Sequence, residues 1–153
     1  MKALELRIPP PVVALLVAGA MWGVARLAPL VDMPDSLRVG AAIVCALTGF
    51  AVGIAGIVSF RLAKTTVNPM KPEATSALVR SGIYRRTRNP MYLGSVLILV
   101  GWAVYLSSAW ALLGTVAFVL YMNRFQIAPE ERVLMSLFGS EYAAYRSQVR
   151  RWL

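Results

Sequence analysis

The chain has 153 residues, of which 58% are hydrophobic, and a formal net charge of +9. This composition is too apolar for an ordinary soluble domain. The absence of histidine excludes histidine general-base chemistry, Ser-His-Asp triads and the commonest metal sites, and the single cysteine, Cys45, excludes an intramolecular disulfide. We therefore expect no metal centre.

The positive charge alone would fit either nucleic acid or a membrane surface. The basic residues gather between and after long apolar runs, which is the pattern of a membrane protein. We therefore expect membrane lipids as partners, and no nucleic acid. The sequence does not indicate an oligomeric state.

Four apolar runs are long enough to be membrane spans. They cover residues 12–28, 39–60, 90–106 and 109–126. Pro29 ends the first run, which we interpret as a retained helix because no small-residue cleavage site clearly follows it. Glycine pairs four residues apart, Gly19 with Gly23 and Gly49 with Gly53, predict a tight hairpin of the first two helices.

The distribution of charge predicts the orientation in the membrane. Of the 16 Lys and Arg residues, 14 lie before the first run, in the loop 61–89, or at and after the end of the fourth run, where Arg124 is included. The positive-inside rule then places this loop and both termini in the cytoplasm. We expect the inner or plasma membrane.

The loop 61–89 is expected to contain a short helix over residues 73–80, with Gly82 just past its end. Pro90 suits the first position of the following helix, and Asn89 is placed to cap it.

A helix start beside arginines can hold a carboxylate or phosphate. Arg85, Arg86 and Arg88 precede this one. The alternative is that their side chains only reach out to lipid headgroups.

After the fourth run, Pro129 is expected to open another helix with Glu130 and Glu131 in its first turn. Gly139 is expected to end it. Beyond it, Tyr142, Tyr145, Val149 and Trp152 form one stripe of an amphipathic interfacial helix.

These features predict an all-α integral membrane protein with four transmembrane helices plus short cytoplasmic interfacial helices. It forms a single domain over residues 1–153, with C-terminal cytoplasmic helices over 129–152. The minimal turn at Ser107–Ser108 makes the third and fourth spans an antiparallel hairpin. Residues 84–92 should therefore neighbour residues 123–131, and such a cluster beside an apolar bundle suits an amphiphilic ligand.

Four motifs in this order resemble the isoprenylcysteine carboxyl methyltransferase family, whose superfamily also includes phospholipid N-methyltransferases. They are Leu78-Val79-x-Ser81-Gly82-x-Tyr84, Arg88-Asn89-Pro90-x-Tyr92-x-Gly94, Glu130-Glu131 and Phe138-Gly139-x-x-Tyr142-x-x-Tyr145. The resemblance covers roughly residues 61–152.

The resemblance implies S-adenosylmethionine as cofactor. By position, it implies that the cofactor lies against Ser76, Ala77, Leu78, Val79, Tyr84, Asn89, Pro90, Met91, Tyr92 and Glu130. The cofactor's carboxylate would suit the helix start, and its amino group and hydroxyls would suit a glutamate. Its adenine would suit the apolar and tyrosine surface.

The sequence departs from the family at two positions. The family usually has histidine in place of Asn89, and asparagine cannot carry a proton. Its eukaryotic members have an arginine for the substrate carboxylate at Gln126, and here Arg124 lies two residues away. We take Arg124 and Gln126 as candidate substrate-binding residues, and carboxylate, thiol, amine and hydroxyl acceptors all stay open.

Methyl transfer to an anionic acceptor needs mainly positioning and a dry site. A lipid amine must first lose a proton. Arg88, Glu130 and Glu131 are the candidate catalytic residues, and the sequence leaves open which glutamate faces the site. The alternative function is a non-catalytic small membrane scaffold or anionic-lipid-binding protein.

Overall fold

The computed structural model describes residues 5–27, 31–65, 70 and 72–153. The described residues form helices and turns and contain no strand, so the all-α prediction is confirmed. The main helices are α1 (Pro10–Leu27), α2 (Asp35–Leu62), α3 (Pro90–Tyr105), α4 (Leu112–Tyr121) and α5 (Ala128–Gln148). Ala28, the last residue of the first predicted span, Pro29, and two of the basic residues behind the predicted orientation, Lys2 and Lys71, lie outside the described residues.

Two helices, α1 with 18 residues and α2 with 28, are long and apolar enough to cross a membrane. Only 22% and 11% of their most apolar windows are buried inside the protein, so neither is the core helix of a soluble domain. α3 and α4 are shorter, with 16 and 10 residues. Length and composition therefore identify two candidate spans among the described residues.

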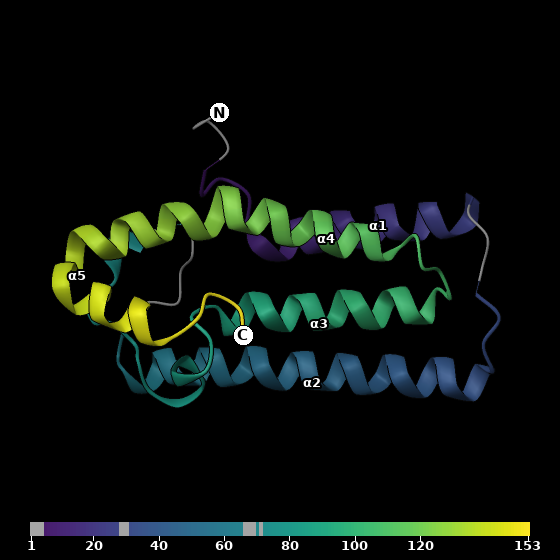
Figure 1. The fold of residues 1–153 in the computed structure, drawn as a ribbon, viewed down its shortest axis with the longest axis horizontal. Coiled ribbons are helices and arrows are strands. Elements are labelled where there is room, and N and C mark those ends of the chain that lie inside the picture. The colour runs from purple at the N-terminus through teal and green to yellow at the C-terminus, as the bar shows by residue number, and fades with distance from the viewer. Residues whose placement is uncertain (1–4, 28–30, 66–69, 71) are drawn as a thin grey trace.

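Helices α1 to α4 lie side by side along the long axis of the molecule, and α5 continues α4 and then folds back at one end (Figure 1). The core lies between α1, α3 and α4, and it includes Met21, Leu99 and Phe118. Large apolar side chains on the outer faces of α1 and α2, such as Leu16 and Leu47, are exposed. This outer surface is the one that a bilayer would cover.

Glycines hold α2 and α3 in close contact. A Cβ on Gly49 would lie 2.6 Å from the Gly94 carbonyl oxygen, and a Cβ on Gly94 would lie 2.5 Å from the Gly49 carbonyl oxygen. About two turns further along α3, Gly101 faces Cys45 of α2. About two turns further along α2, Gly56 faces Pro90 of α3, and a Cβ on either glycine would have similarly little space. We call this contact the glycine seam, and it fixes the start of α3 against the end of α2.

The predicted hairpin of the first two helices is wrong. α2 packs mainly on α3, whereas α1 packs on α4 and α3. Gly19 and Gly23 have open space beside them, so their spacing does not mark a helix contact. Gly49 lies in the glycine seam and therefore packs against α3 instead of α1.

The hairpin of α3 and α4 is present, but its turn is longer than two residues. Ser107 adopts a positive φ of 51°. Ser108 Oγ accepts a hydrogen bond from the Ala111 N–H at 3.3 Å, and regular α4 begins only at Leu112. Backbone hydrogen bonds between residues three apart, such as Ala111 N–H to the Ser108 carbonyl, form turns before α4, so the regular helix starts three residues later than predicted.

No break separates the fourth span from the helix that follows it. α4 continues through the π-helix η4 (Met122–Ile127) into α5. The Leu6 N–H donates to the Phe125 carbonyl at 3.0 Å, which satisfies a carbonyl group within the π-helix. Pro129 therefore lies inside a continuous helical rod, and the expectation that it opens a separate helix is wrong.

Two further local expectations are wrong. The predicted helix over residues 73–80 does not form. The 3-10 turn η2 (Pro72–Ala74) is followed by chain without a helix up to η3 (Gly82–Arg85). Gly82 has a φ of +60° and lies directly against Ser59 of α2, where a side chain would clash. At the other end of the chain, Val149 is extended, with φ −121° and ψ 131°, so Trp152 is not on a helical stripe with Tyr145.

We predict that Gly49→Ala lowers the free energy of unfolding by about 1–3 kcal/mol, because its Cβ has no space in the glycine seam. Gly53→Ala is the matched control, since its Cβ would meet nothing within 4 Å. Thermal unfolding in detergent measures both. Equal melting temperatures for the two variants would contradict the seam.

Candidate functional site

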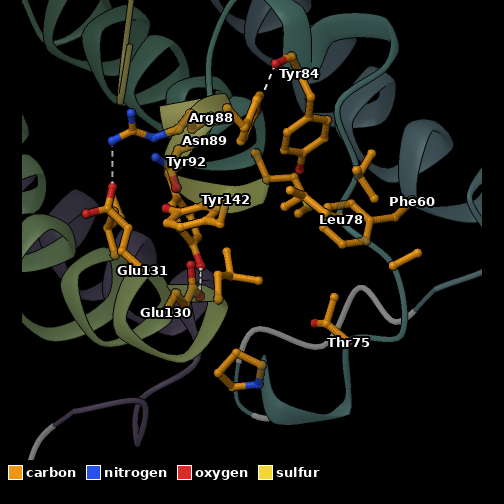
Figure 2. A pocket seen from close by; sticks show the side chains of 17 residues that line it. Phe60, Thr75, Leu78, Tyr84, Arg88, Asn89, Tyr92, Glu130, Glu131 and Tyr142 are labelled. Carbon is orange, nitrogen blue, oxygen red and sulfur yellow. Dashed lines mark hydrogen bonds and ion pairs between the residues drawn. The ribbon is translucent and has the colours of Figure 1, made fainter. Parts of the chain in front are cut away.

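A pocket opens where α3 begins and α5 starts, at the end of the bundle that also holds the C-terminus (Figures 1 and 2). Its cavity volume is about 100 Å³, and about 810 Å³ when the adjoining space that is open to solvent is included. Its lining residues are Phe60, Pro72, Thr75, Ala77, Leu78, Val79, Tyr84, Arg88, Asn89, Met91, Tyr92, Ile127, Glu130, Glu131, Leu134, Tyr142 and Tyr145.

Glu130 receives two short hydrogen bonds at one carboxylate oxygen. The Tyr92 hydroxyl donates to Oε1 at 2.6 Å, and Gln126 Nε2 donates to the same oxygen at 2.6 Å. The Tyr92 bond joins the first turn of α3 to the first turn of α5, as Figure 2 shows. The predicted meeting of residues 84–92 with residues 123–131 is therefore confirmed.

The environment of Glu130 favours its protonated form. Burial raises the pKa of the carboxyl to about 7, although the hydrogen bonds from Tyr92 and Gln126 act in the opposite direction; the neighbouring Glu131 charge adds to the increase. A carboxyl with a pKa near neutrality can take up or release a proton under physiological conditions.

Glu131 lies between two arginines. Its Oε1 accepts from Arg88 Nη2 at 2.8 Å, and Arg151 forms a fork to both oxygens, with Nε at 3.1 Å from Oε1 and Nη2 at 2.6 Å from Oε2. The side chains of Arg88 and Glu131 are 10% and 11% exposed, so this is a largely buried ion cluster.

The cluster keeps Glu131 ionised. Burial alone would raise the pKa of its carboxyl, but the hydrogen bonds and charges of Arg151 and Arg88 more than compensate, so that the pKa is lowered. Adjacent glutamates therefore have opposite properties: Glu130 is suited to proton transfer and Glu131 to a fixed negative charge. Sets of titratable groups that diverge in this way are typical of functional sites.

Asn89 does not cap α3, and that expectation is wrong. Among the residues that the structure describes, no side chain caps this helix start; the Asn89 carboxamide instead donates from Nδ2 to the Arg151 carbonyl at 2.9 Å. The C-terminal residues lie directly beside this helix start, since the Arg150 carbonyl also accepts the Arg88 N–H at 3.0 Å. The first-turn N–H groups of α3, at Met91 and Tyr92, have no intrahelical acceptor.

Arg88 has one donor to spare. Its Nη1 donates to the carbonyls of Arg146 and Val149, and its Nη2 donates to Glu131. Its Nε is buried and has no hydrogen-bond partner among the described residues. A buried orphan donor is costly, and an anionic ligand group in the adjacent pocket would satisfy it.

Aromatic rings form much of the remaining wall. Phe60, at the end of α2, contacts Tyr84 edge to face with ring centroids 5.3 Å apart. The Tyr145 hydroxyl donates to the Tyr84 carbonyl at 2.8 Å. Tyr142 lies between the two sides of the pocket in Figure 2. Burial raises the pKa of Tyr84, whose hydroxyl therefore stays neutral.

Most of the residues named from the sequence meet in this pocket. Those that line it are Ala77, Leu78, Val79, Tyr84, Arg88, Asn89, Met91, Tyr92, Glu130 and Glu131. Pro90 is buried at the helix start but is not part of the lining. Ser76 is exposed, and its hydroxyl and N–H contact Thr65 Oγ1 instead.

The two candidate substrate-binding residues lie outside the pocket lining. Arg124 pairs with Glu5 of the N-terminal segment at 3.0 Å, and Arg132 pairs with the same carboxylate. Gln126 is buried and acts through its hydrogen bond to Glu130. A direct contact of either residue with a substrate stays a prediction.

Several pocket residues were not predicted from the sequence. Tyr142 and Tyr145 were assigned to the membrane interface, yet both are buried and line the pocket. Their spacing of three residues marks a shared helix face, but it does not say what that face contacts. Arg151 does not line the pocket but bonds to Glu131; in the sequence it entered only the count of basic residues, and its role depends on the path of the C-terminal residues.

We predict that Glu131→Gln lowers the free energy of unfolding by about 3 kcal/mol, because it leaves two cations without their shared partner. Glu141→Gln is the control: its ion pair with Arg80 is half-exposed and should contribute at most about 1 kcal/mol. Chemical denaturation in detergent compares the variants. Similar small losses in both would show that the ion cluster does not stabilise the fold.

Comparison with known proteins places this chain in a family. Residues 37–141, more than half of the chain, match the family model described as phospholipid methyltransferase. No solved structure matches the chain.

Three relatives align with parts of the chain. An uncharacterized protein of Haemophilus influenzae is 51% identical over 63 residues, which are 41% of this chain and all of that protein. A probable protein-S-isoprenylcysteine O-methyltransferase of Oryza sativa subsp. indica is 39% identical over 79 residues, or 50% of this chain and 40% of that protein. The protein-S-isoprenylcysteine O-methyltransferase of Saccharomyces cerevisiae is 32% identical over 82 residues, or 52% of this chain and 33% of that protein.

The chain thus spans well under half the length of the two methyltransferases that it matches. The matched family segment includes the glycine seam, the start of α3 and both glutamates of the pocket. The chain belongs to the phospholipid methyltransferase family, within the superfamily that also contains the isoprenylcysteine methyltransferases.

Proposed function

We propose that the protein transfers a methyl group from S-adenosylmethionine to an amphiphilic acceptor at the cytoplasmic membrane face. The observation that carries this proposal is the pocket itself: it joins the first turn of α3 to Glu130 and Glu131, all within the matched family segment. Relatives named as methyltransferases support the reaction class.

The residues present fit the cofactor. The uncapped first turn of α3 and the orphan Nε of Arg88 together suit the carboxylate of its methionine part. Leu78, Phe60 and Tyr84 offer an apolar and aromatic surface for the adenine. The pocket carboxylates suit the amino group and the ribose hydroxyls. When bound, the cofactor supplies an electrophilic methyl group on a sulfonium sulfur.

The chain itself would position the acceptor, exclude water and move a proton. We propose that the acceptor is a group that must lose a proton, such as a lipid amine, and that the proton passes to the Glu130 carboxylate. Glu130 fits this role because Oε1 is held by Tyr92 and Gln126, while Oε2 has no hydrogen-bond partner among the described residues. Ionised Glu131 and Arg88 would then contribute fixed charge.

We further propose a topology for the whole chain as a single domain. α3 and the rod from α4 into η4 would complete four membrane spans beside α1 and α2. Both termini and the pocket would face the cytoplasm, at the inner or plasma membrane. The distribution of basic residues supports this orientation, because 14 of 16 lie at one end of the bundle by sequence order.

We predict that the purified protein in detergent binds S-adenosylhomocysteine, measured by titration calorimetry. Leu78→Trp should weaken binding more than tenfold by filling the pocket, whereas Leu62→Trp, on the exposed outer face of α2, should leave it unchanged. Incubation with labelled S-adenosylmethionine and a membrane lipid and small-thiol extract, followed by mass spectrometry, then identifies the acceptor. Absence of binding by the folded wild-type protein would refute the proposal.

We predict that the methylation rate rises with pH through about 7 and levels above it, because Glu130 accepts a proton only in its ionised form. Glu130→Gln should lower kcat by about 10²–10⁴-fold and abolish this rise, since it removes a general base. Glu73→Gln, at an exposed site in η2, should preserve the profile. A rate that does not change with pH in the wild type would instead indicate an acceptor that is already anionic.

A further inference from the structure

The last five residues, 149–153, follow α5 without forming a helix or strand and run past the start of α3 (Figure 1); we call them the C-terminal strap. Its backbone carbonyls accept hydrogen bonds from the residues just before α3. Arg150 O accepts the Arg88 N–H at 3.0 Å, and Arg151 O accepts Asn89 Nδ2 at 2.9 Å and Thr87 Oγ1 at 3.3 Å. The strap carbonyls therefore take the place of water as hydrogen-bond acceptors for these three donors.

Side chains anchor the C-terminal strap to the opposite side. The Arg151 guanidinium forms its fork to Glu131 of α5 and also reaches Asn123 Oδ1 at 3.4 Å. Trp152 Nε1 donates to the same Asn123 oxygen at 3.1 Å, and its ring packs against the core. Arg150 contributes only its carbonyl, because its side chain is exposed.

The bond between the strap and Asn89 has a consequence for α3. Asparagine at the residue before a helix normally caps it by accepting hydrogen bonds from the first-turn N–H groups. Here the carboxamide is turned to Arg151 O, so those donors stay available at Met91 and Tyr92, which line the pocket. Released from the strap, Asn89 would compete with a ligand for the same donors.

We propose that the C-terminal strap keeps the first turn of α3 open to the carboxylate of the bound cofactor, and that Arg151 is the positioning residue that holds the strap in place. The proposal rests on the proposed function, because it takes S-adenosylmethionine as the ligand. Arg151 acts through Asn89 and Glu131, and it does not line the pocket. The Val149 carbonyl also holds Arg88 Nη1 at 2.7 Å, so the strap orients the second donor of the anion site.

Two ligands separate this role from general stabilisation. S-adenosylhomocysteine carries the amino-acid carboxylate, whereas 5′-methylthioadenosine has the same nucleoside and sulfur but lacks the amino-acid part. Binding of both by calorimetry is compared in the full-length wild type, Arg151→Ala, Arg151→Lys and Arg150→Ala. We expect Arg151→Ala to weaken S-adenosylhomocysteine about tenfold and 5′-methylthioadenosine less than twofold.

The other variants sharpen the comparison. Arg150→Ala should change neither affinity, since it removes an exposed side chain one residue away. Arg151→Lys should restore part of the loss, because it keeps the charge without the fork.

Asn89→Asp is a second test of the same inference, to be used if Arg151→Ala fails to fold. A carboxylate is repelled by the Arg151 carbonyl and caps the helix well, so it should weaken S-adenosylhomocysteine selectively without lowering the melting temperature.

The outcomes are distinguishable. Wild-type protein that binds neither ligand would refute the proposed function, and this inference with it. If the wild type binds but Arg151→Ala and Asn89→Asp change both affinities equally, or neither, the strap does not control the anion site and the proposed function stands. A selective loss of S-adenosylhomocysteine affinity in both variants would establish Arg151 as a positioning residue.

Discussion

The arrangement of the pocket depends on one negative charge placed between two positive ones. Glu131 links Arg88, just before α3, to Arg151, near the end of the chain, and thereby joins segments that are far apart in sequence. A largely buried carboxylate with two such partners is costly to leave unpaired, so the three segments must assemble together. Removal of one partner from such a cluster is strongly destabilising, even though the intact cluster roughly offsets its own desolvation.

The same assembly gives two neighbouring glutamates different properties. Glu131 is fixed as an anion by arginines, whereas Glu130, one residue earlier, faces Tyr92 and Gln126 and has a pKa near neutrality. The π-helix η4 lies directly before them. Such wide turns are frequent at functional sites, and this one ends at residues that line the pocket or bond to it. One chain segment thus supplies both a fixed charge and a proton acceptor for the proposed methyl transfer.

The sequence predicted well what depends on local pattern. Apolar runs and Pro90 located α3 to within one residue, and the short connection of the third and fourth helices correctly placed Tyr92 beside Glu130. It failed where tertiary contacts decide. The spacing of Gly19 and Gly23 is the same as that of a packing motif, but among the described residues no atom lies within 4 Å of a Cβ built on either glycine. The Asn89 carboxamide, which by local rules should cap α3, is taken by a backbone carbonyl more than sixty residues away, and no pattern in the sequence indicates that encounter.

The glycine seam has a mechanical consequence. Because Gly49 and Gly94 bring the two backbones into direct contact, sliding or separation of α2 and α3 would break this close packing, and we expect the two helices to move together. We therefore expect a constant separation between Phe60, at the end of α2, and Tyr92, at the start of α3, when a ligand binds or leaves. Any change in the shape of the pocket would then come from the wall that α5 supplies, and the backbone of α5 bends at Gly139, where φ is 48°. We therefore expect one half of the site to act as a fixed template against which the other half moves.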